Sequence, residues 1–280
     1  MEIGRKIGEG GTSEVFEWGK NKVIKLAKPN TDVSALHREY KNNLTVWKMG
    51  LSVPKPFEVV EFNHRPGIIF ERVNGESMKD RLFKVIMEKI NINKYDKDWT
   101  DVRVTARLLS ELHQLSNDKI RPQRLFLKRQ IQSVEYLTED EKKDVISLLD
   151  CLPEKNKICH GDPNPNNILI SNDEPVFIDW NDATSGNPES DVAEYILVIK
   201  FAILPSETPQ IIVETFDSMR ETIIQVFMDE YTLLTGTTYD EIEPWIMPIA
   251  ARKLTADAIS DAEKQLLVNE IRKKLVKKYN

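Results

Sequence analysis

The stretch that decides the fold is His160-Gly161-Asp162-Pro163-Asn164-Pro165-Asn166-Asn167, which is followed after two short apolar runs by Ile178-Asp179-Trp180. Two prolines, a glycine and three asparagines exclude a helix or an inner strand, so these residues form a loop. The apolar runs at 167–170 and 176–178 flank a turn at 171–174 and predict a small hairpin. Such a hairpin returns Asp179 to the side of Asn167.

This loop and hairpin bring together oxygen-bearing side chains. The amide oxygen of Asn167 and the carboxylate of Asp179 are hard ligands suited to Mg²⁺, with phosphate oxygens and water completing its shell. Asp162 is then left to face an acceptor hydroxyl as a base. The alternative is an Asx-rich turn without a ligand, which explains the whole string poorly.

A second element is the glycine-rich segment Gly8-Glu9-Gly10-Gly11-Thr12-Ser13-Glu14-Val15. Glycines let backbone N–H groups approach phosphate oxygens with no Cβ in the way. Taken alone, the segment is better explained as a glycine-rich hairpin turn than as a phosphate-binding loop. It is neither a Walker loop nor a dinucleotide fingerprint, because no Gly-Lys-Ser/Thr follows and no helix opens directly after it. The residues that we expect to contact a nucleotide here are Gly8, Gly10, Gly11, Thr12 and Ser13.

Lys25 and Glu39 follow this loop on a strand and a helix. Lys25 lies in the apolar strand 23–26 and would serve as a point charge for phosphates if it faces a cleft, whereas an exposed edge-strand lysine is the commoner case. Glu39 lies at the margin of the apolar stripe of the helix expected at 33–49, which Val33 opens. It can therefore either reach inward to orient Lys25 or pair along its own helix.

The pattern of elements changes along the chain. Strands are expected at 14–18, 23–26, 57–62 and 67–71, and helices at 101–115, from the capping box at 138–141, and from Asp191 onward. We therefore expect an α+β protein with a strand-rich nucleotide-binding lobe at 1–73 and a helix-rich catalytic and substrate-binding lobe at 74–280. Ligands often bind between such lobes.

Bulk properties narrow the class of protein. The chain has 280 residues, 40% of them hydrophobic, and a formal net charge of −6. The acidic balance disfavours nucleic acid as a partner, and no apolar run is long enough to span a membrane. Two cysteines cannot form a disulfide framework, and no secretory signal opens the sequence, so a cytoplasmic protein is expected. Nothing in the sequence identifies a protein partner.

At these positions the chain resembles the kinase fold in its small-molecule branch, the aminoglycoside phosphotransferase and choline kinase family, over nearly its whole length. The glycine segment is similar to the protein-kinase loop, with Ser13 in place of the third glycine. Lys25 and Glu39 take the strand-lysine and helix-glutamate positions. His160-Gly161-Asp162 stands where protein kinases have His-Arg-Asp, and Ile178-Asp179-Trp180 where they have Asp-Phe-Gly.

The resemblance implies a bilobal protein-kinase-like fold, ATP as cofactor with GTP as the alternative, and Mg²⁺. The adenine would be held by the backbone of the hinge at 69–73, with Glu71 and Val73 as its expected contacts. Asp191 would correspond to the aspartate that steadies the catalytic loop. Its sequence context also predicts a helix N-cap, with Glu194 at the third helical position.

The acceptor is expected to be a small molecule. Only eleven residues separate Asp179 from Asp191, which leaves no room for the segment that binds a peptide substrate. Asp182 and Glu189 would suit a cationic acceptor such as an aminoglycoside, which would connect the protein with antibiotic resistance. The alternatives are a kinase of another small alcohol (choline, a macrolide or a sugar) and a non-catalytic nucleotide-binding regulator. The four histidines predict no metal cluster.

Overall fold

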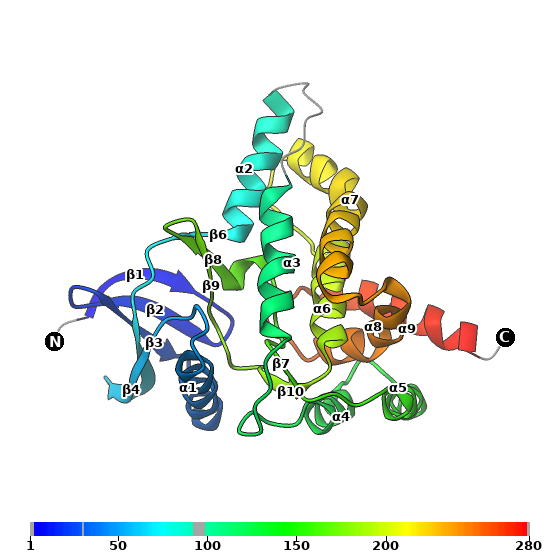
Figure 1. Cartoon of the computed structure of the whole chain (residues 1–280), viewed down its shortest axis with the longest axis horizontal. Coiled ribbons are helices and arrows are strands. Elements are labelled where there is room, and N and C mark those ends of the chain that lie inside the picture. The colour runs from blue at the N-terminus through cyan, green and yellow to red at the C-terminus, as the bar shows by residue number, and fades with distance from the viewer. Residues whose placement is uncertain (1–2, 30, 92–98, 279–280) are drawn as a thin grey trace. The chain divides into compact units, whose positions relative to one another are not determined.

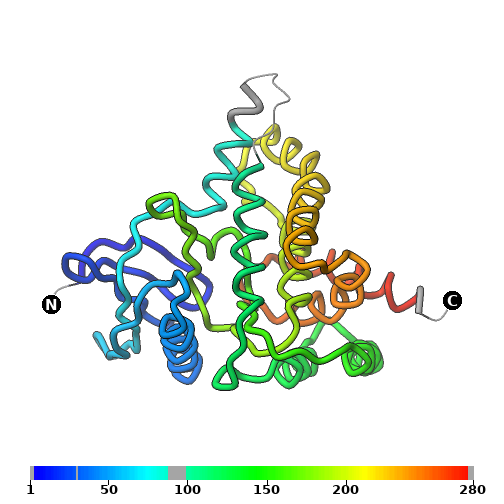
Figure 2. The backbone as a smooth tube through the Cα atoms, viewed as in Figure 1, coloured from blue at the N-terminus to red at the C-terminus, as the bar shows by residue number. Residues whose placement is uncertain are grey.

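The computed structural model describes residues 3–29, 31–91 and 99–278. Its contacts divide the chain into two compact units. Unit 1 combines Met1–Ser77 with Asn167–Ala183, and unit 2 combines Met78–Asn166 with Thr184–Asn280. Each unit is therefore made of two separate segments of the chain. The backbone of these segments can be followed by its colour in Figure 2.

Unit 1 is built on a five-stranded antiparallel sheet with the strand order β1-β2-β3-β5-β4 (Figure 1). Its elements are β1 (Ile3–Glu9), β2 (Ser13–Trp18), β3 (Lys22–Ala27), α1 (Val33–Lys48), β4 (Pro56–Phe62) and β5 (Arg65–Glu71). The strands expected from the sequence are confirmed, and the glycine-rich segment forms the hairpin turn between β1 and β2.

The two faces of strand β3 have different environments because successive side chains point to opposite sides of a sheet. Ile24 and Leu26 are buried in a cluster with Ile69 of β5. On the other face, Ala27 belongs to a second cluster that includes Leu36 of α1. Lys25 shares this second face, so its side chain is directed toward α1.

The buried face of helix α1 differs from the expected apolar stripe. Val33 is 49% exposed, so its predicted burial is wrong. Leu36 is buried as expected, but Asn42 and Asn43 are buried as well. The reason is a polar contact that periodicity cannot reveal: the Asn42 side-chain amide donates to the backbone carbonyl of Trp180 at 2.9 Å.

A three-stranded sheet explains why Asn167–Ala183 belongs to unit 1. Strand β6 (Glu76–Ser77) pairs with β8 (Ile168–Ser171), which pairs in turn with β9 (Glu174–Phe177). Gly75 is required at this crossing, because a Cβ there would lie 2.4 Å from the carbonyl oxygen of Ile170. The expected lobe ranges 1–73 and 74–280 stay a prediction, and they include residues 1–2, 30, 92–98 and 279–280, which lie outside the described residues.

Unit 2 is mainly helical (Figure 1). Its elements are α2 (Met78–Asn91), α3 (Thr100–Leu112), α4 (Gln123–Ser133), α5 (Glu139–Cys151), β7 (Lys157–Cys159), β10 (Thr184–Gly186), α6 (Pro188–Phe201), α7 (Gln210–Thr235), α8 (Tyr239–Lys253) and α9 (Asp261–Lys278). Helix α6 packs against α7, α8 and α9 and is buried on almost every side, its acidic residues Glu189, Asp191 and Glu194 included. The predicted capping box of α5, made by Thr138 and Glu141, is confirmed.

No helix in the described part of the chain is long and apolar enough to cross a lipid bilayer.

The two cysteines are expected to differ in reactivity. Cys151 is exposed, whereas Cys159 is fully buried and its burial raises the pKa of its thiol. Because the thiolate is the reactive form, Ellman's reagent should titrate one thiol in the native protein and two after denaturation. Rapid reaction of two thiols in native protein, with unchanged circular dichroism, would contradict the buried position of Cys159.

Candidate active site

A charged cluster in unit 1 centres on Lys25. The Lys25 ammonium donates to Oε1 of Glu39 at 2.7 Å and lies 3.0 Å from Oδ1 of Asp179. Lys25 and Glu39 are almost fully buried, whereas the Asp179 side chain is 43% exposed. Glu39 was expected either to reach inward to Lys25 or to pair along its own helix. In the structure it reaches inward and contacts Lys25.

The charges of this cluster act on one another. Burial lowers the pKa of the Lys25 ammonium, but Asp179 and Glu39 raise it more, so the pKa ends well above its ordinary value. Burial raises the pKa of Glu39 to about 7, opposed by Lys25 and helped by the charge of Asp179. The raised pKa of Lys25 thus follows from its two carboxylate neighbours, whereas the raised pKa of Glu39 follows first from its burial.

The hairpin of β8 and β9 brings Asn167 beside the strand that leads to Asp179. The backbone N–H of Ile178 donates to the Asn167 carbonyl at 2.9 Å, and Ile168 pairs with Phe177. Asp179 itself has a φ of 64°, a left-handed conformation that residues other than glycine rarely adopt. Strained positions of this kind cluster at functional sites.

The donor set of this hairpin suits a divalent cation. The Asn167 amide and the Asp179 carboxylate offer oxygen atoms from adjacent positions of one rigid hairpin, and Asp179 is open to solvent. Hard cations such as Mg²⁺ prefer these oxygens and retain part of their own water shell. The residues therefore fit the metal expected from the sequence, while the assignment itself stays a prediction.

The glycine loop is held at its base by backbone contacts. The N–H of Gly10 donates to the Ser13 carbonyl at 2.9 Å, and the N–H of Lys28 donates to the Thr12 carbonyl at 2.8 Å. Gly10 does not have a left-handed φ, and a Cβ there would meet nothing closer than 3.9 Å. The fold alone therefore does not require glycine at this position.

The segment expected to form the hinge lies at the end of β5. The N–H of Glu71 donates to the Lys55 carbonyl at 2.8 Å, and the N–H of Arg72 donates to the Asn21 carbonyl at 3.0 Å. Val73 has no backbone hydrogen bond to another described residue. The absence of such a bond is compatible with the adenine contact expected there.

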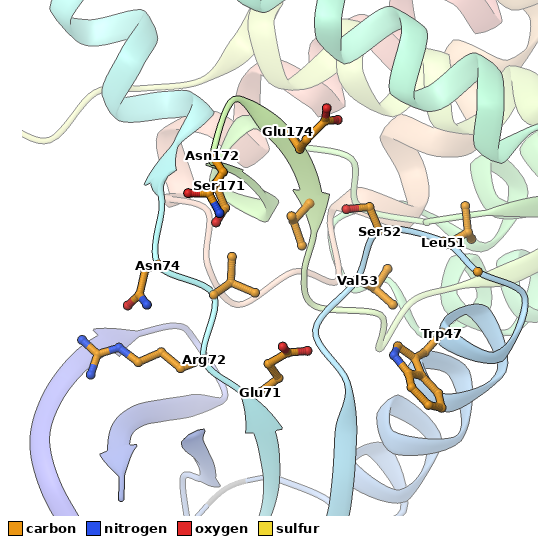
Figure 3. Close-up of a pocket in the computed structure, with 13 residues that line it drawn as sticks. Trp47, Leu51, Ser52, Val53, Glu71, Arg72, Asn74, Ser171, Asn172 and Glu174 are labelled. Atoms are coloured by element: carbon orange, nitrogen blue, oxygen red, sulfur yellow. The ribbon is translucent and has the colours of Figure 1, made fainter. Parts of the chain in front are cut away.

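A pocket of about 740 Å³ borders the same segment in unit 1. Figure 3 shows Glu71, Arg72 and Asn74 on one side and the residues around Val53 on the other. The glycine loop, Lys25 and Asp179 do not line it. This pocket is therefore separate from the cluster of charges around Lys25.

In unit 2, Asp191 holds the backbone of the predicted catalytic loop. Its two carboxylate oxygens accept from the N–H groups of His160, at 2.6 Å, and Gly161, at 2.9 Å. Gly161 has a φ of 84°, so this turn favours glycine. The prediction that Asp191 is a helix N-cap is wrong, because α6 begins at Pro188 with Asn187 as its N-cap.

Asp162 is oriented by its own loop. Its backbone N–H donates to Nδ1 of His160 at 3.3 Å, and the Asn164 side-chain amide donates to Oδ1 of Asp162 at 2.8 Å. The backbone of Asn166 donates in turn to Oδ1 of Asn164 at 2.8 Å. This chain of bonds explains why asparagines alternate with prolines: the amides fix the carboxylate while the prolines stiffen the loop.

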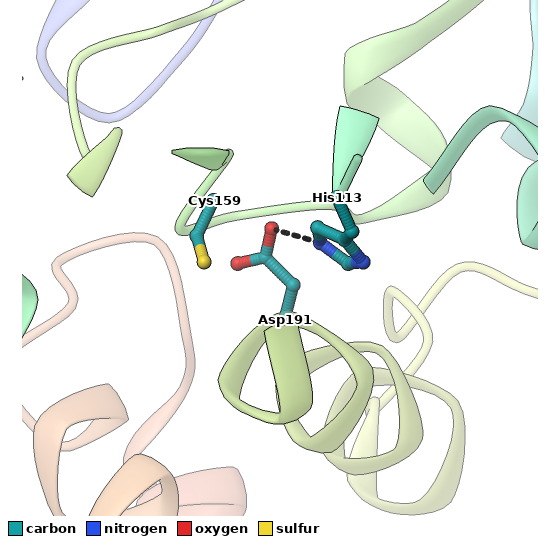
Figure 4. A group of neighbouring side chains, drawn as sticks. All are labelled: His113, Cys159 and Asp191. Carbon is teal, nitrogen blue, oxygen red and sulfur yellow. Dashed lines mark hydrogen bonds and ion pairs between the residues drawn. The ribbon is translucent and has the colours of Figure 1, made fainter. Parts of the chain in front are cut away.

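Sequence reasoning missed one buried neighbour of this loop. Nε2 of His113, at the end of α3, lies 3.2 Å from Oδ2 of Asp191, and its Nδ1 lies 2.7 Å from the Tyr231 hydroxyl. Figure 4 shows the side chains of His113, Cys159 and Asp191 near one another. A ring nitrogen of His113, the sulfur of Cys159 and a carboxylate oxygen of Asp191 all lie within 4.8 Å of one another. Because Asp191 already accepts two backbone N–H bonds, we interpret the group as a support of the loop rather than a metal site.

The two residues expected to bind a cationic acceptor have different environments. Asp182 lies in unit 1, half-buried, where its charge contributes to the raised pKa of Glu39. Glu189 lies in the first turn of α6 in unit 2, is buried, and pairs with Lys155. A substrate would have to compete with Lys155 for the Glu189 carboxylate, so Asp182 is the more accessible of the two.

The predicted site residues are thus distributed over both units. Unit 1 contains Gly8, Gly10, Gly11, Thr12, Ser13, Lys25, Glu39, Glu71, Val73, Asn167, Asp179 and Asp182, and unit 2 contains Asp162 and Glu189. Of these, the structure joins Lys25, Glu39 and Asp179 by direct contacts and Asn167 to the same cluster through the hairpin.

Several solved structures that are similar to this chain are named as small-molecule kinases. A thermostable mutant of aminoglycoside phosphotransferase APH(4)-Ia has a TM-score of 0.61 at 16% identity, covering 98% of this chain and 94% of that one. The GDP and kanamycin complex of APH(2")-IIia has a TM-score of 0.60 at 12% sequence identity, and the match covers 99% of this chain and 93% of that one. A putative fructosamine-3-kinase from Haemophilus somnus 129PT has a TM-score of 0.61 at 13% sequence identity, and the match covers 96% of this chain and 92% of that one. At these identities the likeness shows the fold alone.

No curated protein matches this sequence. A family model does match: that of the phosphotransferase enzyme family (APH) matches residues 4–218, which is more than half of the chain and includes the glycine loop, Lys25, the catalytic loop and Asp179. The α+β fold, the resemblance noted in the sequence and this match agree, and the chain belongs to the phosphotransferase enzyme family of small-molecule kinases.

Proposed function

We propose that this protein transfers the γ-phosphoryl group of ATP, or of GTP, to a hydroxyl of a small molecule, with Asp162 as the base. The observation that carries the proposal is the contact of Lys25 with both Glu39, at 2.7 Å, and Asp179, at 3.0 Å. A lysine fixed between two carboxylates is a preorganised cation for nucleotide phosphates. Solved relatives of the same fold contain GDP with kanamycin and ADP with hygromycin B.

In the proposed reaction the acceptor oxygen attacks the γ-phosphorus as the bond from that phosphorus to the β–γ bridging oxygen breaks. The nucleoside diphosphate leaves with the bridging oxygen, and the hydroxyl proton passes to Asp162 and then to solvent. Asp162 is suited to this role because Asn164 fixes one of its oxygens. Lys25, held by Glu39, neutralises phosphate charge.

Asn167 and Asp179 would hold Mg²⁺ in this reaction. The ion would offset the negative charge of the nucleotide phosphates. The bond from the Ile178 backbone to the Asn167 carbonyl supports this assignment, because it holds Asn167 next to the segment that leads to Asp179.

The acceptor is proposed to be a small polar alcohol, and a cationic one such as an aminoglycoside fits the excess of carboxylates around Lys25. Asp182, half-buried in unit 1, is its proposed contact. Family members with this fold include enzymes named for aminoglycosides and for fructosamine. Amino sugars and aminoglycosides therefore come first among the acceptors to test, and a role in antibiotic resistance depends on the result.

A phosphate-transfer screen tests the proposal. Purified protein would be incubated with Mg-ATP or Mg-GTP and a panel of aminoglycosides, amino sugars, macrolides and choline, with mass spectrometry of each acceptor. We expect an acceptor heavier by one phosphate, and none with Asp162→Asn. If nucleotide binds but neither transfer nor phosphate release occurs under any condition, the protein is a non-catalytic regulator instead.

The glycine loop can be tested separately from folding. Gly10→Ala should leave the melting temperature unchanged, because the added Cβ has room in the fold. Its methyl group would keep phosphates from the loop, and we expect the KM for nucleotide to rise about tenfold, the equivalent of one hydrogen bond of roughly 1.4 kcal/mol. Gly75→Ala is the contrasting variant, because its Cβ would meet the Ile170 carbonyl and destabilise the protein. An unchanged KM in Gly10→Ala would exclude close phosphate approach at this residue.

A further inference from the structure

Lys253 is a buried cation that the proposed mechanism has not used. It is the last residue of α8, and its ammonium donates to Oε1 of Glu194 in α6 at 2.7 Å. The side chains of Lys253 and Glu194 are only 7% and 2% exposed. The C-terminal end of a helix carries partial negative charge, which favours a cation there. Burial nevertheless makes such a charge costly, so its retention calls for a partner or a function.

The charges at this end of α8 are not balanced by Glu194 alone. Arg252 also faces Glu194, with NH1 3.5 Å from Oε2, so one carboxylate serves two adjacent cations. Glu263 at the start of α9 is a further carboxylate near Lys253, but its own burial raises its pKa and weakens it as a counter-ion. Arg252 and Lys253 thus share the Glu194 carboxylate at this end of α8.

The charge of Lys253 lies close to the catalytic loop. Glu194 follows Asp191 by three residues in α6, so both side chains lie on one face of the helix, one turn apart. Asp191 binds the backbone of His160 and Gly161, which directly precede Asp162. In agreement with this geometry, burial lowers the pKa of Lys253, but the charges of Glu194 and then Asp162 raise it more.

The residues from His160 to Asn167 include neither lysine nor arginine. Within this loop the neutral side-chain amide of Asn164 donates to Asp162. A carboxylate that must accept a hydroxyl proton and keep one orientation gains from a fixed positive charge nearby. Helix α8 presents such a charge from a part of the sequence about ninety residues later.

We propose that Lys253 is a positioning residue for the phosphoryl transfer, whose ammonium, held by Glu194, attracts the Asp162 carboxylate and fixes its orientation toward the acceptor hydroxyl. The inference rests on the proposed function, since it concerns the same base. It assigns to the α6–α8 ion pair a role in the rate of the reaction in addition to any role in folding.

The test compares three substitutions by steady-state kinetics with Mg-ATP, measuring phosphate release to water and transfer to an acceptor found by the screen. Lys253→Met removes the charge and keeps the length of the side chain; we expect kcat to fall roughly tenfold to a hundredfold, with the KM for ATP changed less than about twofold. Lys253→Arg retains the charge and should recover most of the lost rate. Lys274→Met, which breaks the ion pair of Lys274 with Glu243 on the same helix α8, is the matched control and should retain the wild-type rate.

A double variant separates positioning from stability. Lys253→Met alone leaves Glu194 buried with less compensation and lowers stability, whereas Glu194→Gln combined with Lys253→Met removes both charges and should recover the melting temperature. Under the proposal, kcat stays low in this stable double variant. Recovery of kcat together with stability, or a wild-type kcat in folded Lys253→Met, would overturn the positioning role. If the wild-type protein neither releases nor transfers phosphate, the proposed function itself is wrong and the inference falls with it.

Discussion

Asp162→Asn is expected to lower the phosphate-transfer rate by roughly 10²–10⁴-fold, the usual contribution of a general base, while nucleotide affinity stays nearly unchanged. Asparagine has the size of aspartate and can still accept the bond from Asn164, so the loop should keep its shape. It cannot take the hydroxyl proton. Transfer rates from mass spectrometry and nucleotide affinities from calorimetry would measure the two effects independently.

The matched control for this substitution is Asp118→Asn. Asp118 is exposed in unit 2, in the turn between α3 and α4, so the same loss of charge occurs away from the loop. Its activity should equal that of the wild type. Turnover by Asp162→Asn close to the wild-type rate, in protein that folds and binds nucleotide, would rule out Asp162 as the base.

Asp179→Asn is expected to abolish the effect of Mg²⁺ on nucleotide binding and to reduce transfer roughly 10²–10³-fold. Asparagine tolerates the left-handed φ of 64° better than most residues, so the backbone should be kept. The substitution removes the anionic metal ligand and one of the two carboxylates that contact Lys25, while Glu39 still holds the lysine. The direct measurement is the nucleotide dissociation constant with and without Mg²⁺ in both proteins.

Asp173→Asn provides a close control for this effect. Asp173 has a φ of 63° and lies exposed in the turn of the same hairpin, so the chemical change and the backbone conformation are matched. This variant should bind Mg-nucleotide like the wild type. If Mg²⁺ strengthened nucleotide binding equally in Asp179→Asn, the metal would have to be held by other residues.

Local patterns gave the strands predicted between residues 14 and 71, the hairpin of β8 and β9 and the capping box of α5 correctly, because these depend on turn residues and alternation over a few positions. The short strands β6, β7 and β10 were not predicted. They were less reliable for helix α1, where Val33 is exposed and Asn42 is buried. The hydrophobic period identifies a helix, but it cannot identify a polar face that is buried by a backbone carbonyl from residue 180. The N-cap predicted at Asp191 failed for the same reason, since its carboxylate binds a loop thirty residues earlier instead of its own helix.

The sequence by itself determined which residues are proposed to carry the chemistry: an oxygen-rich loop around Asp162, a hairpin joining Asn167 to Asp179, and a lysine and a glutamate at the expected positions. These signals are local, since each depends on residue types at short, fixed spacings. Only the tertiary structure decided which distant charges meet, namely Lys25 with Glu39 and Asp179, His113 with Asp191, and Lys253 with Glu194. Such pairs are not encoded in any short pattern, because the packing of helices and strands brings together side chains that lie tens of residues apart.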